Sequence, residues 1–253
     1  MVNQTTNKKQ TATAFGSRSN SYLISKNHKE GSDLDILSNW STESRFILDI
    51  ATGAGHAANA ISQNIPSRTI ATDISPKMVR TAISAYPSLE GVISDAECLP
   101  FQSSTFDTIV CRIAAHHFPN PLTFLSEVAR ISAKPAIFLF EDNVAPTLPS
   151  LNTFLNKVEK LRDPTHIESY TENQWKHWIE EQGFTIEYTL TLKKNIEYLP
   201  WIRQSNTPPG NIEKLNDLFI NAPPAAKKLF DIQITNGVVD SFSNLKILIK
   251  AIR

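Results

Sequence analysis

The chain has 253 residues, of which 41% are hydrophobic and 20% charged, a composition typical of a globular protein. The 25 basic residues balance the 25 acidic ones, so the positive excess by which nucleic-acid-binding domains attract phosphates is missing, and no nucleic-acid partner is expected. The two cysteines, Cys98 and Cys111, are too few for a disulfide scaffold or a cysteine-rich zinc site, and we predict no metal site.

Residues 1–14 are polar and include Lys8 and Lys9, without the apolar segment of a signal peptide or the arginines of a transit peptide. No apolar run approaches the roughly twenty residues that span a bilayer. We therefore predict a flexible N-terminal tail over residues 1–14 and a single domain over residues 15–253. We expect a cytoplasmic protein without membrane insertion, and its oligomeric state is left open.

Strands and helices alternate through the middle of the chain. Short apolar runs predict strands at 45–50, 69–72, 91–94, 106–112 and 136–140. Between them apolar residues recur at helical spacing, and the pairs Ser75-Pro76 and Asn120-Pro121 supply helix-start signals. This alternation is typical of an α/β fold with a doubly wound, mostly parallel sheet.

The regular alternation ends near residue 142. The pattern predicts helical stretches over 146–170 and within 199–237, which fall outside the sheet and are expected to form lid insertions. Further strands at 184–198 and 244–252 complete a seven-stranded sheet. Between them in the chain, Thr171 and Gln174 form a capping box for a helix that ends at Gly183.

A glycine loop follows the first strand. Asp49 ends this strand, and Gly53 and Gly55 precede the next helix. Glycines let the backbone turn sharply and approach a ligand closely, and the free N–H groups of the helix start lie at its positive end. A lone Gly-x-Gly is a weak signal, so the loop by itself also fits a simple turn.

Carboxylates also end the next two strands, as Asp73 and Asp95. A carboxylate accepts hydrogen bonds at two oxygens, so Asp73 suits the two hydroxyls of a ribose and Asp95 suits the exocyclic amine of adenine. The three acids together predict an adenosine site at the carboxyl ends of the strands. The alternative is that they cap the following helices, which is best supported for Asp73, beside Ser75.

The loop Gly53-x-Gly55-x-x-Ala58 also fits the dinucleotide fingerprint, so an NAD(P)-dependent oxidoreductase is a competing interpretation. Asp49 argues against it, because its negative charge suits the ammonium of a methionine group and not a pyrophosphate. A Tyr-x-x-x-Lys pair is present as Tyr22 and Lys26, but it precedes the first strand, whereas short-chain dehydrogenases carry it after the fourth.

The sequence resembles the class I S-adenosylmethionine-dependent methyltransferases, and within them the ubiquinone/menaquinone-biosynthesis group. The resemblance covers residues 15–142 well and the remainder loosely. It rests on four matching stretches: Ile47–His56, Ala71–Met78, Ser94–Phe101 and Phe106–Phe118. The family usually has Lys-Pro-Gly-Gly before the fifth strand, whereas this chain has Lys134-Pro135-Ala136-Ile137, so that turn must form without glycine.

The resemblance implies S-adenosyl-L-methionine as the cofactor and roles for individual residues. It divides the domain into a cofactor-binding half, 40–142, and helical and acceptor-side elements, 146–237. The implied cofactor residues are Asp49, Gly53 and Gly55 at the methionine end, Asp73 at the ribose, Ile74 and Met78 against the adenine, and Asp95 and the Ala96 amide at the adenine edge.

Methyl transfer requires alignment of acceptor, methyl and sulfur, and a base when the acceptor is a phenol or an enolisable carbon. We predict His116, which follows the fourth strand, as that base; the alternative is that His116 bonds a backbone carbonyl while His117 packs with Phe118. Arg112 is a candidate for the donor carboxylate or for a structural ion pair. Phe15 and Tyr22 share a helical face and either shield the sulfonium or simply pack.

We therefore predict transfer of a methyl group to a small-molecule acceptor, aromatic or quinone-like, by C- or O-methylation. Trp175, Trp178 and Trp201 are mostly core residues by their spacing, although some could line a pocket for an apolar acceptor. A third interpretation is a non-catalytic protein that keeps S-adenosylmethionine as a structural ligand.

Overall fold

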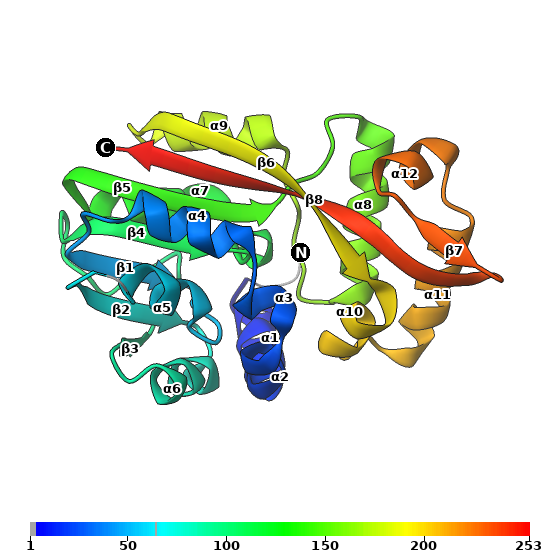
Figure 1. Cartoon of the computed structure of the whole chain (residues 1–253), viewed down its shortest axis with the longest axis horizontal. Helices are drawn as coiled ribbons and strands as arrows, with labels where there is room; N and C mark the ends of the chain where they lie inside the picture. The colour runs from blue at the N-terminus through cyan, green and yellow to red at the C-terminus, as the bar shows by residue number, and fades with distance from the viewer. Residues whose placement is uncertain (1–3, 64) are drawn as a thin grey trace.

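The computed structural model describes residues 4–63 and 65–253, which form a central sheet flanked by helices (Figure 1). The strands are β1 (Phe46–Ile50), β2 (Arg68–Asp73), β3 (Glu90–Ile93), β4 (Phe106–Arg112), β5 (Ser132–Asn143), β6 (Thr185–Glu197), β7 (Gln233–Thr235) and β8 (Val238–Ile252). The helices are α1 (Gln4–Ser17), α2 (Ser19–Ile24), α3 (Lys26–Lys29), α4 (Ser32–Trp40), α5 (His56–Ser62), α6 (Pro76–Ala85), the 3-10 turn η1 (Ala115–His117), α7 (Pro121–Ile131), α8 (Pro149–Arg162), α9 (Glu172–Glu181), α10 (Tyr198–Gln204), α11 (Pro209–Ile220) and α12 (Pro224–Leu229). None of these described helices has the length and apolarity needed to cross a membrane.

The sheet has the order β3-β2-β1-β4-β5-β8-β6, and the short β7 pairs with β8. Strands β1 to β5 are parallel, whereas β8 runs antiparallel to both β5 and β6. The seven predicted strands are present, which confirms the mostly parallel α/β sheet, and β7 is an addition. The chain reverses its direction of winding between β1 and β4, the switch point at which such sheets bind ligands.

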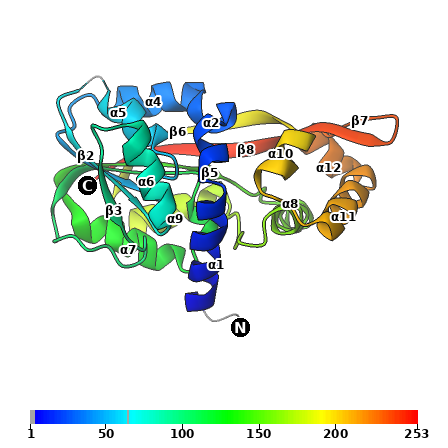
Figure 2. The same ribbon diagram turned by 90° about the horizontal axis from the view of Figure 1, so that it is seen from below.

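Helices cover the two faces of the sheet in separate layers, with α4 and α5 on one side and α7 and α9 on the other (Figure 2). The central strand β4 shows how its sequence supports both layers. Val110 packs with Leu37 of α4 and Ile61 of α5, while its neighbours Ile109 and Cys111 belong to the core that includes α7 and α9. Because successive side chains of a strand point to opposite faces, a strand covered on both faces is apolar at consecutive positions.

Strands β6 and β8 continue beyond the rest of the sheet (Figure 1). Pairing of β8 with β5 stops at Lys246, whereas its pairing with β6 continues to Ser241. These outer parts of β6 and β8, together with β7, α8, α10, α11 and α12, are called the extension below. The extension has its own buried aromatic core, which includes Trp201, Phe219 and Phe242.

The helices predicted as lid insertions are present, and they form most of the extension. The helix expected over 146–170 ends at Arg162, because Pro164 disfavours helical backbone at the residue before it. The stretch 199–237, within which helical segments were expected, contains most of α10 together with α11, α12 and β7. Its helices pack on the aromatic core and so are part of a folded layer.

The prediction of a flexible tail over residues 1–14 was wrong for residues 4–14, which lie in α1. The sequence of this helix shows no amphipathic stripe, so its position depends on individual tertiary contacts. The Lys8 ammonium lies 2.7 Å from carboxylate oxygens of both Asp95 and Glu97, and Arg18, directly after α1, forms a buried ion pair with Asp163 at 3.1 Å. Residues 1–3 lie outside the described part of the chain.

The departure from Lys-Pro-Gly-Gly is accommodated inside β5. Lys134 and Pro135 lie in this strand, where its register against β4 shifts between the pairs Phe106↔Ser132 and Thr108↔Ile137. The segment therefore continues as an irregular strand and does not need glycines for a turn.

Candidate functional site

A pocket lies at the carboxyl ends of β1, β2 and β4 and continues under α8 and α10 of the extension. The glycine loop forms its floor beside α5, with left-handed backbone at Gly53 (φ 56°) and Gly55 (φ 87°). A Cβ atom on Gly55 would lie 3.0 Å from the side chains of Ala82 and Tyr86, whereas a Cβ on Gly53 would meet nothing within 4 Å. Gly55 is thus required for packing against α6, and Gly53 leaves its space to the pocket.

Asp49 lies at the end of β1, where it is 1% exposed. Its carboxylate accepts hydrogen bonds from the Thr52 hydroxyl at 2.7 Å and from the Ala58 N–H at 3.1 Å. Burial raises the pKa of Asp49 to about 7, because these hydrogen bonds only partly offset the loss of solvation. A cationic ligand beside this carboxylate would therefore stabilise its charged form.

Asp73 ends β2 and also has a raised pKa, about 6, chiefly through burial. One carboxylate oxygen accepts from the Gly53 N–H at 3.0 Å, and the other accepts from the Ser75 N–H at 2.8 Å. Part of the capping alternative is therefore correct, because Asp73 orders the start of α6, where the Ser75 hydroxyl is the N-cap. A carboxylate oxygen accepts more than one hydrogen bond, so Asp73 retains capacity for a ligand.

The predicted adenine-binding residues lie on the same side of the site. Ile74 and Met78 line the main pocket beside Asp73, and Ile74 also lines an adjoining small pocket with Asp95 and Ala96. Lys8 of α1 lies in this small pocket too, and its ammonium contacts Asp95. The structure thus adds a basic residue of α1 at a position that the sequence pattern did not indicate.

Arg112 lies on the pocket wall but is engaged in ion pairs. Its guanidinium contacts the carboxylates of Asp33 and Glu141, the latter at 2.9 Å, and donates to the His28 carbonyl at 3.1 Å. Lys246 extends this network through an ion pair of 2.8 Å with Glu141. Of the two roles considered for Arg112, the structural ion pair is therefore present.

His116 is held by Asp142, a residue at the end of β5 that sequence reasoning missed. Its Nδ1 lies 2.6 Å from one carboxylate oxygen, and its backbone N–H donates to the other oxygen at 2.9 Å. Burial alone would lower the pKa of His116, but the charge of Asp142 and its hydrogen bond outweigh burial and raise this pKa. Because Nδ1–H donates to the carboxylate, the neutral ring carries its lone pair at Nε2.

Two further histidines surround His116 without sharing its basicity. The ring of His117 lies 4.2 Å from that of His116, and the ring of His166 lies 5.5 Å away. Burial and the charge on His116 lower the pKa of His117 to about 3, and the same causes lower that of His166. His117 therefore packs as the alternative expected, but its phenylalanine contact is with Phe15, which it meets edge-on at 4.8 Å, and the ring of His116 bonds to the Asp142 carboxylate and not to a backbone carbonyl.

His56, in the glycine loop, is a helix-start residue without a free ring nitrogen. Its Nε2 donates to the Tyr22 carbonyl at 3.1 Å and its Nδ1 lies 2.8 Å from the Tyr86 hydroxyl. Burial lowers the pKa of His56, so the ring is neutral and accepts from the tyrosine at Nδ1.

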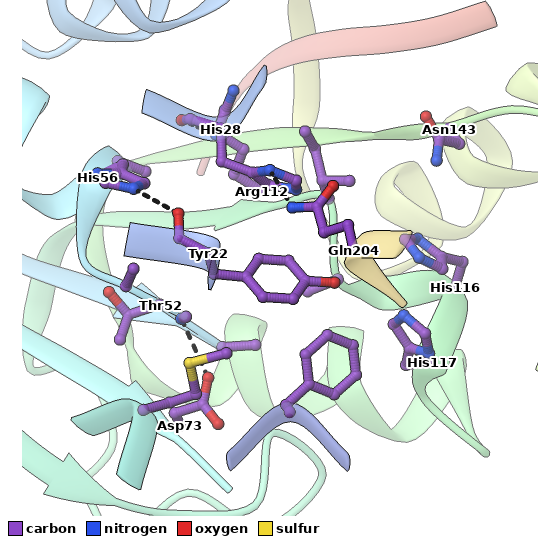
Figure 3. A pocket seen from close by; sticks show the side chains of 18 of the residues that line it. Tyr22, His28, Thr52, His56, Asp73, Arg112, His116, His117, Asn143 and Gln204 are labelled. Carbon is purple, nitrogen blue, oxygen red and sulfur yellow. Dashed lines mark hydrogen bonds between the residues drawn. The ribbon is translucent and has the colours of Figure 1, made fainter. Parts of the chain in front are cut away.

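Aromatic rings cross the middle of the pocket. The rings of Phe15 and Tyr22 lie 5.6 Å apart, and the Tyr22 hydroxyl is directed toward His116 and His117 (Figure 3). Trp201 of α10 lines the far side, while Trp175 and Trp178 pack with the main core. Lys26, the other member of the Tyr-x-x-x-Lys pair, is exposed and lies outside this pocket.

The residues of β1 to β3 fit a nucleoside that carries a positive charge. Two buried carboxylates with raised pKa face the pocket, a glycine leaves space beside them, and apolar side chains lie next to Asp73. Among the described residues no cluster of histidine, cysteine and carboxylate side chains is arranged to hold a metal ion.

Comparisons with known proteins give a consistent result. A family model described as "Methyltransferase domain" matches residues 48–140. YcgJ of Bacillus subtilis, described as an uncharacterized methyltransferase, is 32% identical over 95% of this chain and 98% of its own. The crystal structure of YcgJ has a TM-score of 0.83 and covers 88% of this chain and 98% of that one, at 31% identity.

Two further proteins show weaker similarity. The uncharacterized protein YafE of Escherichia coli is 27% identical over 71% of this chain and 88% of its own. A SAM-dependent methyltransferase of Aquifex aeolicus shares the fold, with a TM-score of 0.57 at 14% identity over 94% of this chain and 98% of that one.

Proposed function

Since this chain belongs to the methyltransferase family that includes YcgJ and is a class I S-adenosylmethionine-dependent methyltransferase, we propose that its acceptor is a small aromatic or quinone-like molecule. The cofactor supplies a methyl group on a positively charged sulfur. The glycine loop is therefore interpreted as part of the site for this cofactor and not for a dinucleotide. The proposal rests chiefly on the His116–Asp142 pair, because His116 lines the pocket that also contains Asp49, Asp73 and the aromatic rings.

We assign the cofactor-binding residues as follows from their positions in the pocket. Asp49 neutralises the ammonium of the methionine group, Gly53 lets the backbone approach it, and Gly55, which packs closely against α6, completes the turn that positions Gly53. Asp73 accepts from the ribose hydroxyls. Ile74 and Met78 contact the adenine ring, while Asp95 and the Ala96 amide contact its polar edge. Arg112 lies on the pocket wall and stabilises it through its ion pairs with Asp33 and Glu141.

His116 acts in this proposal as the base that removes a proton from the acceptor. Nε2 is the nitrogen that receives this proton, and Asp142 stabilises the positive ring that results. The raised pKa favours proton uptake, and the depressed pKa of His117 keeps the neighbouring ring neutral, so a single positive charge forms.

The aromatic lining supports an aromatic acceptor. Phe15, Tyr22 and Trp201 come from three helices and provide flat apolar surfaces around the pocket, and such surfaces both pack on a ring and exclude water. A phenol or a hydroquinone also carries the acidic proton that a histidine base would remove. We further propose a cytoplasmic location, in keeping with the two free thiols of Cys98 and Cys111.

The test is transfer of an isotope-labelled methyl group from S-adenosylmethionine to the small molecules of a cell extract, followed by identification of the labelled product. We expect a labelled aromatic or quinone-like compound, whose formation requires the intact pocket. A labelled protein, nucleic acid or aliphatic compound would contradict the acceptor class. Binding of the donor without any transfer would favour the non-catalytic alternative.

A further inference from the structure

Two neighbouring histidines, His116 and His117, line the same pocket. Their ring centres lie 4.2 Å apart, and both rings lie on the side of the pocket toward which the Tyr22 hydroxyl is directed (Figure 3). A neutral histidine ring donates a hydrogen bond at one nitrogen and accepts one at the other. The partners of the two Nδ1 atoms therefore determine what the two Nε2 atoms offer to a ligand.

The hydrogen bonds of Thr165 place the ring proton of His117 on Nδ1. The Thr165 hydroxyl donates its single proton to Asp163 at 2.6 Å, and its oxygen lies 3.3 Å from Nδ1 of His117. Asp163 is in a buried ion pair with Arg18, so its carboxylate is charged and only accepts. The Thr165 oxygen can then only accept from His117, and Nδ1 is the donor. Because burial and the charge on His116 lower the pKa of His117 to about 3, its ring is neutral and Nε2 carries a lone pair.

The pocket thus contains two adjacent hydrogen-bond acceptors. Nε2 of His116 carries a lone pair because Nδ1 donates to Asp142 at 2.6 Å. Neither of the two Nε2 atoms bonds to another residue among those that the structure describes. Both histidines are buried, and a buried acceptor without a partner is costly. A molecule that donates two hydrogen bonds from neighbouring positions would satisfy both nitrogens.

We propose that the acceptor is an aromatic molecule with hydroxyl groups at two neighbouring ring positions, a catechol, and that His116 and His117 each bind one of these hydroxyls. This inference rests on the proposed function and names the class of its substrate. Neighbouring hydroxyls lie at one edge of a ring and can reach two adjacent histidines together. The hydroxyls of a hydroquinone point to opposite ends of its ring, so only one of them can reach the pair. Phe15, which meets the His117 ring at 4.8 Å, provides an apolar surface for the catechol ring beside the two nitrogens.

The two histidines act differently on the hydroxyls that they bind. Nε2 of His116, whose pKa Asp142 raises against the effect of burial, takes the proton of one hydroxyl. The oxygen of this hydroxyl forms a bond to the methyl carbon as the bond from that carbon to sulfur breaks, and the electron pair of the broken bond stays on the sulfur. His117 accepts a hydrogen bond from the other hydroxyl and leaves its proton in place. The product is therefore a catechol methylated at one oxygen, and His116 releases the proton to solvent.

Anaerobic calorimetry with S-adenosylhomocysteine at saturation tests this proposal. The probes are catechol, hydroquinone and phenol, titrated into the wild-type protein, His117→Phe and His117→Gln. Phenylalanine keeps a ring against Phe15 but cannot accept a hydrogen bond, whereas glutamine can place an amide oxygen near the position of Nε2 and is the matched control. The wild type should bind catechol about tenfold more tightly than phenol or hydroquinone, the ratio expected for one additional hydrogen bond. His117→Phe should bind the three probes alike, and His117→Gln should keep a preference for catechol of about threefold or more.

Equal binding of catechol and phenol by the wild type, hydroquinone binding as tight as that of catechol, or a preference that survives in His117→Phe would overturn the proposal. A preference lost in both variants would also overturn it, because loss of the Thr165 contact would then explain the result. If His117→Phe does not fold, the order of the three probes in the wild type decides. In each of these cases binding of phenol leaves the proposed function intact. Failure of the wild type to bind S-adenosylhomocysteine, or any of the three probes, would instead contradict the proposed function, and this inference with it.

Discussion

The cofactor side and the acceptor side of the pocket are built in different ways. At the ends of β1 and β2, Asp49 bonds to Thr52 and Ala58, which are three and nine residues away, and Asp73 bonds to Ser75 and Gly53, which are two and twenty residues away. On the acceptor side the partners are distant in sequence: Glu141 and Lys246 are 105 residues apart. A local loop can be recognised from its residues, whereas a wall assembled by the fold requires the structure.

A substitution on one side of the pocket should leave the function of the other side unchanged, and His116→Ala is the strongest test of this expectation. With the acceptor found by methyl labelling, we expect the rate of transfer to fall by about 100-fold or more, because a general base is lost. Affinity for S-adenosylhomocysteine, measured by calorimetry, should be unchanged. His177→Ala, at an exposed histidine of α9, is the control and should leave both quantities unchanged. A matching loss of cofactor affinity in His116→Ala would mean that the two sides are not independent.

Asp142→Asn sharpens this test, because it keeps the shape of the partner and removes its charge. The carboxylate raises the pKa of His116, so we expect that pKa to fall in the variant. NMR titration of the histidine ring measures the pKa without any acceptor. An unchanged pKa would exclude Asp142 as the group that controls His116.

Two ligands distinguish the roles of Asp73 and Asp49 on the cofactor side. Asp73→Asn should weaken S-adenosylhomocysteine and 5′-methylthioadenosine alike, by about 10- to 100-fold for a lost charged hydrogen bond, since both contain the ribose. Asp49→Asn should weaken only S-adenosylhomocysteine, since 5′-methylthioadenosine lacks the amino-acid end. Calorimetry gives all four affinities, and equal effects of both variants on both ligands would disprove the separate roles.

The cofactor side should also respond to pH. Asp49, with a pKa of about 7, is mostly protonated at pH 6 and ionised at pH 8, and only the ionised form pairs with an ammonium. We therefore expect the affinity for S-adenosylhomocysteine to rise by about tenfold from pH 6 to pH 8. Asp49→Asn should remove most of this rise. An affinity that is constant or that falls over this range in the wild type would contradict the role of Asp49.

The smallest expected effect concerns α1. Lys8→Met removes the ion pairs with Asp95 and Glu97, which are partly exposed and so contribute little free energy. We expect S-adenosylhomocysteine to dissociate about two- to threefold faster, because α1 is held less firmly over the adenine side. Stopped-flow measurement gives this rate, and the exposed Lys9→Met is the control. Slower dissociation in Lys8→Met would show that Lys8 competes with the cofactor.

Prediction from sequence succeeded where structure depends on local residues. The apolar strands, the N-cap at Ser75 and the capping box of Thr171 with Gln174 are all encoded within a few residues and are present in the structure. The positions of Asp49 and Asp73 at one edge of the sheet follow from the parallel strands that precede them. Their roles in binding the cofactor remain predictions.

Prediction from sequence failed where tertiary contacts determine the structure. Helix α1 has no apolar stripe, and ion pairs with residues almost ninety positions later in the chain hold it in place. Asp142, which holds His116, comes from the neighbouring strand β5, and no sequence motif links the two residues. Lys194 and Lys246 face the same pocket only because β6 and β8 pair in antiparallel register.

A crystal structure of the complex with S-adenosylhomocysteine tests the central claim most directly. We expect the ribose hydroxyls within hydrogen-bond distance of the Asp73 carboxylate, the amino group beside Asp49, and the sulfur facing the side of the pocket that contains His116. A nucleoside bound elsewhere on the protein, or one in this pocket with its ribose away from Asp73, would contradict the account.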